Sequence, residues 1–202
     1  MNLYRSTNWY KQLITTLLIV LLGFISCKRT GQVKVLIHTS LGEIEVEMYP
    51  GLAPVTANNF LSLVDAGTYE GAIFYRVVRM DNQAKNKVKI EVIQGGLFDD
   101  SLIDEYTPIE HETTTETRIL HTDGVISMAR MEPGTASTEF FICIGDQPSL
   151  DSGGDRNPDG AGFAAFGKVI RGMDVVRAIQ ALPDKGQYLV DPVEIRKISR
   201  MP

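Results

Sequence analysis

Short segments of β-type sequence, separated by turns, dominate the chain after residue 32, and this pattern limits the folds that it can adopt. Glu43–Met48 alternates acidic and apolar side chains, which is typical of a half-buried strand. With Val33–Thr39 before it and the turn Ser40–Gly42 between them, it predicts an opening β-hairpin. Further strand candidates follow at Ala72–Val78, Lys87–Ile93, Gly124–Met128, Glu139–Ile144, Ala164–Val169 and Val193–Ile198.

Only two segments have the apolar spacing of a helix. In the first, Thr56 is the predicted N-cap and Gly67 ends the helix. The second covers Asp174–Leu182 and stops before Pro183. Many strands and two helices favour a mainly β domain, in which a closed antiparallel barrel has helices packed outside it or over its ends. The apolar stripe of the first helix consists of Ala57, Phe60, Leu61 and Val64.

The composition fits one globular domain with a short appendage. The chain has 202 residues, of which 44% are hydrophobic and 22% are charged. A net charge of -5, without a basic run outside the N-terminus, argues against a nucleic-acid partner. The three histidines lack metal-ligand spacing, so we expect no metal and no cofactor. The chain also has no nucleophile-elbow motif for a serine–histidine–acid triad.

The N-terminus has the layout of an export signal. Arg5 and Lys11 precede the apolar run Leu13–Ile25, which is shorter than the roughly 20 residues of a membrane-spanning helix. Cys27 follows directly after a small residue. This arrangement resembles a bacterial lipoprotein signal, in which the peptide is cut before the cysteine and the cysteine is acylated. Phe24 stands where that signal usually has leucine.

The resemblance divides the chain into three parts. Residues 1–26 would be the signal peptide, residues 27–32 the lipidated Cys27 with a tether, and residues 33–202 the folded domain. Several acyl chains would hold the protein firmly on a bacterial envelope membrane. Lys28-Arg29 after the cysteine gives no acidic surface-export signal, so we expect the domain to face the periplasm. An uncleaved single-pass anchor is the alternative.

Four motifs in the predicted strands carry a second resemblance. They are FYRVV (Phe74–Val78), IQGG (Ile93–Gly96), GVISMAR (Gly124–Arg130) and FFICIG (Phe140–Gly145). Together and in this order, within a match from about Val33 to Ile198, they resemble the cyclophilin family. The resemblance implies an eight-stranded antiparallel barrel with two capping α-helices. It also implies a monomeric peptidyl-prolyl cis-trans isomerase that acts on proline-containing polypeptides without a cofactor.

The resemblance also assigns candidate site residues. The catalytic arginine of the family falls on Arg76, and the glutamine before the double glycine falls on Gln94. Ala129 and Arg130 occupy the segment whose backbone contacts the bound peptide. The positions of the apolar proline pocket are Phe141, Val92, Leu150 and Phe163.

The chemistry of prolyl isomerisation needs these residue types. Resonance gives a peptide bond a rotation barrier of about 18–20 kcal/mol. No bond breaks, so the enzyme only has to stabilise the twisted amide more than either ground state. A guanidinium suits this because it stays charged and offers several N–H donors in one plane. An apolar pocket holds the proline ring while the preceding residue turns.

One departure from the family pattern concerns charge near the candidate arginine. Glu139 precedes the FF pair where glutamine is usual. We expect this carboxylate to lie near Arg76 and either to restrain it or to draw it away from substrate. A cyclophilin fold that binds proline peptides without turnover therefore stays open as an alternative.

A second departure concerns the pocket rim. The sequence between the candidate arginine and glutamine is longer than usual and predicts an extended hairpin over Arg79–Glu91. Glu91 takes the position of a pocket aromatic, while Ser149 and Phe163 replace a tryptophan and a histidine common in the family. The hairpin is either a tolerated surface insertion or a binding element of an envelope scaffold.

Overall fold

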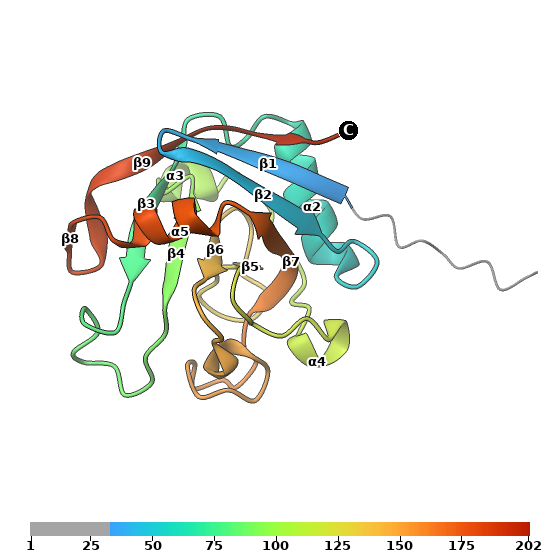
Figure 1. The fold of residues 1–202 in the computed structure, drawn as a ribbon. Coiled ribbons are helices and arrows are strands. Elements are labelled where there is room, and N and C mark those ends of the chain that lie inside the picture. The colour runs from blue at the N-terminus through green and yellow to red at the C-terminus, as the bar shows by residue number, and fades with distance from the viewer. Residues whose placement is uncertain (1–32) are drawn as a thin grey trace, which may run out of the picture.

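A computed structural model describes residues 33–202, which form a closed antiparallel β-barrel (Figure 1). The predicted segments 1–26 and 27–32, with Cys27, lie outside the described residues. The strand order is β1-β2-β7-β5-β6-β4-β3-β9, and pairing of β1 with β9 closes the barrel. The two-residue β8 only lengthens the edge of β9. The strands are β1 (Val33–Thr39), β2 (Gly42–Met48), β3 (Ala72–Val78), β4 (Val92–Gly96), β5 (Val125–Met128), β6 (Phe140–Cys143), β7 (Ala164–Arg171), β8 (Asp184–Lys185) and β9 (Tyr188–Arg200). The predicted fold class is confirmed.

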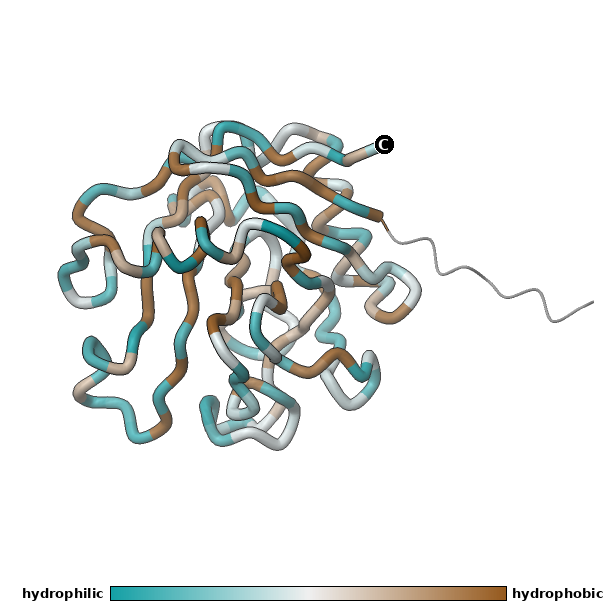
Figure 2. The backbone as a smooth tube through the Cα atoms, viewed as in Figure 1, coloured by the Kyte–Doolittle hydropathy of each residue, from teal (hydrophilic) through white to brown (hydrophobic). Residues whose placement is uncertain are grey.

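The opening hairpin shows how alternation places the core. β1 and β2 pair from Val33 opposite Met48 to Thr39 opposite Gly42. Ile44, Val46 and Met48 are fully buried inside the barrel, as their period of two predicts. In Figure 2 the hydrophobic positions gather along the strands, whereas the loop between β3 and β4 is mostly hydrophilic.

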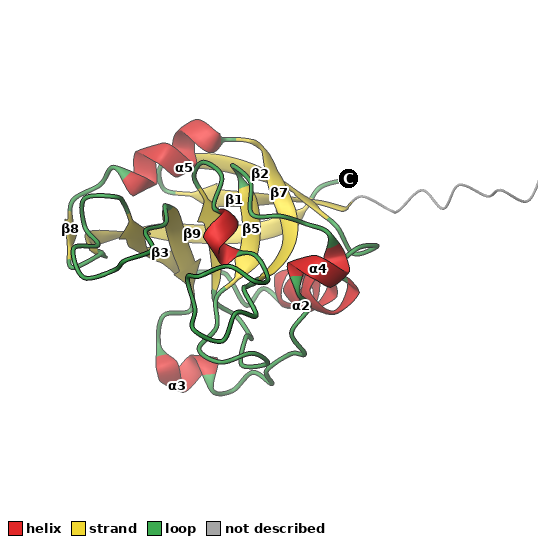
Figure 3. Ribbon diagram, turned by 90° about the horizontal axis from the view of Figure 1, so that it is seen from below, coloured by secondary structure: helices red, strands yellow, loops and turns green. Residues whose placement is uncertain are grey.

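Two longer helices pack outside the barrel, on separate sides of it (Figure 3). They are α2 (Pro54–Asp65), which contacts β7 and β9, and α5 (Met173–Gln180), which contacts β2, β3 and β4. The predicted stripe of α2 is buried, and its Phe60 ring meets Phe140 edge to face at 5.4 Å. Three short turns of helix were not predicted: α3 (Asp100–Ile103), α4 (Thr114–Thr117) and the 3₁₀ helix η1 (Pro148–Leu150).

None of the helices within residues 33–202 is long and apolar enough to cross a membrane.

The predicted N-cap of the first helix is wrong. The helix begins at Pro54, because proline at the first position fixes a helical φ, and Ala53 before it offers no side-chain cap. The carboxylate of Glu112 caps the helix instead, from a distant loop. It accepts hydrogen bonds from the N–H groups of Val55 (3.1 Å) and Thr56 (2.7 Å).

The predicted hairpin over Arg79–Glu91 is also wrong, because this segment is an irregular loop and β4 begins only at Val92. The side chain of Gln83, which is 2% exposed, takes the place of strand pairing. Its amide donates to the carbonyl oxygens of Arg79 (2.8 Å) and Ile90 (2.7 Å) and accepts from Ile90 N–H (3.3 Å). One buried side chain therefore satisfies the backbone on both sides of the loop.

Alternation along β6 divides the apolar residues into two groups. Phe140 and Ile142 point into the barrel core, whereas Phe141 and Cys143 point outward into a smaller cluster. Burial raises the pKa of the Cys143 thiol, so it stays uncharged and unreactive. The outer cluster consists of Val78, Ile90, Val92, Phe141, Cys143 and Leu150.

The Glu112 cap makes a testable contribution to stability. We expect Glu112→Ala to lower the free energy of unfolding by about 1 kcal/mol, because two N–H groups of α2 lose their acceptor. Urea denaturation measures the change, and Glu110→Ala, which alters an exposed carboxylate two residues earlier, is the control. Equal stability of the two variants would contradict this account of the cap.

Candidate active site

A bulge in β3 brings Arg76 to the outer face of the barrel. Phe74 and Val77 both point into the core, which strict alternation would not allow. The register of β3 shifts between Phe74 and Arg76 against both neighbouring strands, so Tyr75 and Arg76 share one pairing step. Both side chains then line the outer cavities, since a bulge re-aims side chains in this way.

Two glutamines hold the guanidinium of Arg76. Gln94, opposite it on β4, accepts a hydrogen bond from Nη1 at 2.9 Å. Gln187 accepts from Nε at 3.1 Å and from Nη2 at 2.7 Å through one oxygen. An arginine has five N–H groups, and these bonds use three of them. The remaining N–H groups have no acceptor within the described residues and are free to meet a substrate.

A chain of hydrogen bonds orients Gln94. Its amide nitrogen donates to the Tyr75 hydroxyl at 2.6 Å, and this hydroxyl donates to Glu139 at 2.6 Å. The expected contact between Glu139 and Arg76 is therefore absent from the described structure, since the carboxylate lies behind Tyr75. An ionised carboxylate only accepts hydrogen bonds, so it fixes the direction of the chain and turns the Gln94 oxygen toward Arg76.

Glu139 is itself enclosed by the end of β4. It accepts the Leu97 N–H at 2.6 Å, and a side chain on Gly96 would overlap its carboxylate. This close approach explains the second glycine of the IQGG motif. Burial raises the pKa of Glu139 above its usual value, and the hydrogen bonds from Tyr75 and Leu97 lower it only in part. Burial likewise raises the pKa of the Tyr75 hydroxyl, which stays protonated as a donor.

Beside Arg76 lies a cavity of about 330 Å³ that has an apolar wall and a polar side with Arg156 and Asn157. Arg76 and Gln94 line this cavity. The four predicted pocket residues line it too, namely Phe141, Val92, Leu150 and Phe163. The Phe141 ring meets Phe163 edge to face at 5.3 Å, which fixes one wall. Ile90 also lines the cavity, whereas Glu91, expected at the aromatic position, does not.

Arg130 closes the pocket from the side. Its side chain is 1% exposed and binds Asp159 through two hydrogen bonds of 2.9 Å. The guanidinium lies 5.0 Å from the centre of the Phe163 ring, a cation–π contact. The side chain therefore supports Phe163, and both Arg130 and Ala129 line the cavity.

A buried network lies behind the Phe141 wall. His121 is within hydrogen-bond distance of Ser127 (3.0 Å) and Asp151 (2.7 Å) and stacks on Phe141 at 5.9 Å. The order of groups is that of a hydrolase triad, which the sequence did not lead us to expect. Ser127 is fully buried, so its hydroxyl meets no substrate, and the network acts as support for Phe141.

A second cavity of about 450 Å³ adjoins the first, with Tyr75, Gln94, Ala129 and Tyr188 lining both. Aromatic rings form one side of it. The ring centre of Tyr75 lies 4.7 Å from that of the exposed Phe98 and 6.4 Å from that of Tyr188. Within residues 33–202 no cluster of acids, histidines and cysteines could hold a metal ion.

Several residues of this site escaped the sequence analysis, Tyr75, Ile90 and Gln187 among them. Tyr75 lies inside a quoted motif, and its position next to Arg76 was the available signal. Ile90 lies two residues before Val92, so strand periodicity would have placed both on one face. Gln187 gave no signal, because it lies 111 residues from Arg76 in the sequence.

Comparisons with known proteins agree with this fold. The family model described as cyclophilin type peptidyl-prolyl cis-trans isomerase/CLD matches residues 34–200. A peptidyl-prolyl cis-trans isomerase of Acinetobacter baylyi is 36% identical over 79% of this chain and 78% of its own length. Isomerase B of Escherichia coli is 32% identical over 72% and 82% of the two chains. A crystal structure of a Cryptosporidium parvum cyclophilin superposes with a TM-score of 0.66 at 23% identity, covering 85% of this chain and 98% of that one.

The chain therefore belongs to the cyclophilin-type peptidyl-prolyl cis-trans isomerase family. Its activity is that of its relatives, the cis-trans isomerisation of bonds that precede proline.

The buried Glu139 predicts a pH dependence of stability. Its pKa in the folded state is raised above the usual 4.5, so the folded state binds more protons than the unfolded state in the window above that value. Stability from this group is present at low pH and is lost as pH rises through the folded pKa. We expect the wild type to gain stability relative to Glu139→Gln as pH falls from neutral toward 4.5.

Urea denaturation of both proteins across this range measures the difference. Glu70→Gln, which alters an exposed carboxylate, is the control. A difference between wild type and Glu139→Gln that is constant with pH would show that the carboxyl has the same pKa in both states.

Proposed function

We propose that this isomerase accelerates rotation about X–Pro bonds in extracytoplasmic proteins, as a monomer anchored by lipid at Cys27. We assign Arg76 as its catalytic residue, with Gln94 beside it. The observation that carries the assignment is the position of the Arg76 guanidinium, which has N–H groups without an acceptor in the described residues and lines the same cavity as Phe141, Val92 and Leu150.

The mechanism rests on a change in the proline nitrogen. In the planar amide its lone pair is delocalised, and as the bond twists the lone pair becomes available to accept a hydrogen bond. The free N–H groups of Arg76 donate to it, and this contact is stronger in the twisted state than in either planar state. Phe141, Val92 and Leu150 hold the proline ring, so the residue before proline is the one that turns.

The substrate class follows from the pocket and from a neighbour. The cavity beside Arg76 is apolar where Phe141, Phe163 and Leu150 line it, which suits a pyrrolidine ring. The Cryptosporidium parvum cyclophilin was also solved in the presence of the dipeptide Ala-Pro. Proline-containing polypeptides are therefore the proposed partners. A binding module without turnover, or an envelope scaffold, is the second candidate.

The proposed location rests on the N-terminal sequence. Residues 1–26 read as a signal peptide and Cys27 as the acylated residue. The folded domain begins six residues later, at Val33. The start of β1 and the loop between β3 and β4 lie at opposite sides of the barrel (Figure 1). An anchor at this end would leave the side of the barrel with that loop turned toward clients, on the periplasmic side of the membrane.

Arg76→Ala tests the catalytic assignment. We expect kcat/KM to fall roughly 100-fold, since a donor to the developing charge is lost. A protease-coupled proline-isomer assay on the chain without residues 1–26 measures it. Arg196→Ala, which removes an exposed arginine from β9, should keep the wild-type rate. Equal rates for Arg76→Ala and wild type would remove Arg76 from the mechanism.

The same assay separates the second candidate. If the wild type binds a proline peptide by calorimetry but does not accelerate its isomerisation, the protein is a binding module. Acceleration that exceeds the spontaneous rate at low enzyme concentration supports the enzyme.

Cys27→Ala tests the anchor. In cells fed a labelled fatty acid, we expect the wild type to carry the label and to remain with the membrane fraction, because several acyl chains hold it there. The variant should lose both the label and the membrane association. Retention of the unlabelled variant in the membrane would favour an uncleaved apolar anchor over residues 13–25.

A further inference from the structure

The tight turn between β8 and β9 holds a residue in an unfavourable backbone conformation. The strands pair from Asp184 opposite Leu189 to Lys185 opposite Tyr188, so Gly186 and Gln187 form a two-residue loop. Their φ angles are 63° and 78°. Both central residues of such a turn need positive φ, which glycine and asparagine adopt most easily. A glutamine at the second position is strained, and strain of this kind is often kept at functional sites.

The side chain of Gln187 faces the catalytic arginine. Its oxygen accepts from Nε and Nη2 of Arg76 at 3.1 and 2.7 Å. Its amide nitrogen donates to the carbonyl oxygen of Asn82 at 3.2 Å. Because the carbonyl of Asn82 can only accept, the amide nitrogen of Gln187 must face it. The amide oxygen is therefore left facing Arg76.

The backbone of Gln187 is also tied on both sides. Its N–H donates to the Asp184 carboxylate at 2.9 Å, and its carbonyl accepts from Val77 N–H at 2.8 Å. Val77 directly follows Arg76 on β3. The turn is therefore bonded both to the strand that carries the arginine and to the arginine itself.

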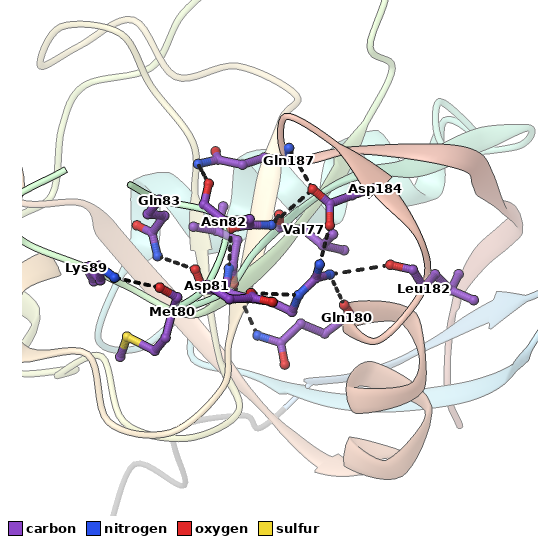
Figure 4. Close-up of polar contacts among 12 residues, drawn as sticks. Val77, Met80, Asp81, Asn82, Gln83, Lys89, Gln180, Leu182, Asp184 and Gln187 are labelled. Atoms are coloured by element: carbon purple, nitrogen blue, oxygen red, sulfur yellow. Dashed lines mark hydrogen bonds and ion pairs between the residues drawn. The ribbon is translucent and has the colours of Figure 1, made fainter. Parts of the chain in front are cut away.

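Asp184 links this turn to the long loop after β3, as Figure 4 shows. Its carboxylate, 6% exposed, pairs with the Arg79 guanidinium and accepts from Asn82 Nδ2 at 3.2 Å. Arg79 also donates to the carbonyl oxygen of Gln180 in α5 at 2.8 Å. Burial alone would raise the pKa of Asp184, but the bonds from Gln187, Arg79 and Asn82 outweigh it and lower the pKa.

We propose that Gln187 is a positioning residue for the isomerase reaction, which holds the Arg76 guanidinium in the orientation that meets the twisted amide. The inference rests on the role of Arg76 proposed above. Without Gln187, one hydrogen bond to Gln94 remains, and the guanidinium turns about its last bonds. The apolar pocket is not changed, since Gln187 does not line it.

Gln187→Gly is the decisive variant, because it removes the acceptor and also relieves the positive φ. We expect kcat to fall roughly 10-fold with KM nearly unchanged, since the lost contact acts in the transition state. The melting temperature should stay the same or rise. A purely structural role of Gln187 predicts the opposite pattern, which is a lower melting temperature with the wild-type kcat. A folded Gln187→Gly variant with the wild-type kcat would overturn the proposal.

Three further proteins complete the series, all as the full chain in detergent. Gln187→Glu keeps an acceptor oxygen and should retain most of the wild-type kcat. Lys185→Ala changes an exposed neighbour in the same turn and should match wild type. In an Arg76→Ala background, Gln187→Gly should cause no further loss of kcat, because its effect passes through Arg76. A further 10-fold loss in that background would overturn the proposal.

A measurement without turnover separates this proposal from the proposed function. In protein labelled with ¹⁵N-arginine, the Nε–H signal of Arg76, assigned by its loss in Arg76→Ala, reports the bond to Gln187. We expect slow exchange with water in the wild type and faster exchange in Gln187→Gly. Equal exchange in both overturns the positioning role. If the wild type shows no isomerase activity but exchange differs, the role of Arg76 in catalysis fails while the contact stands.

Discussion

The bulge at Tyr75 and Arg76 is the constraint on which the site depends. A regular strand would place one of these side chains inside the barrel, where a guanidinium without a partner carries a large desolvation cost. The extra residue in β3 turns both side chains outward while Phe74 and Val77 stay in the core. The barrel then keeps its packing, and the site gains a cation and a hydroxyl from adjacent positions.

The direction of the hydrogen bonds is the second constraint. Arg76 can only donate, so both glutamines must present their oxygen to it. Gln94 is oriented by the hydrogen bond that its amide nitrogen donates to the Tyr75 hydroxyl. That hydroxyl is oriented in turn by its hydrogen bond to the carboxylate of Glu139. Gln187 is oriented by the hydrogen bond that its amide nitrogen donates to the carbonyl oxygen of Asn82. Glu139, which stands where glutamine is usual, therefore makes no contact with Arg76. Its carboxylate accepts the hydrogen bond from Tyr75 instead.

The sequence predicted what depends on periodicity and missed what depends on long-range side-chain contacts. The barrel, the stripe of α2 and the pocket positions Phe141 and Leu150 follow from alternation, helical spacing and the family resemblance. The cap of α2 was missed because Glu112, far along the chain, replaces the local Thr56. The loop after β3 was read as a hairpin because the bonds from the buried Gln83 side chain are invisible to a strand pattern.

The long loop between β3 and β4, Arg79–Glu91, contributes to the site at both of its ends. At its end it supplies Ile90 to the apolar wall of the cavity beside Arg76. At its start it supplies Asn82, which orients Gln187, and Arg79, which pairs with Asp184 of the same turn. A loop added only to the surface would tolerate any polar sequence, whereas this one has its backbone satisfied by a buried Gln83. Its residues therefore connect the wall of the pocket with the support of the arginine, and a change in the loop reaches both.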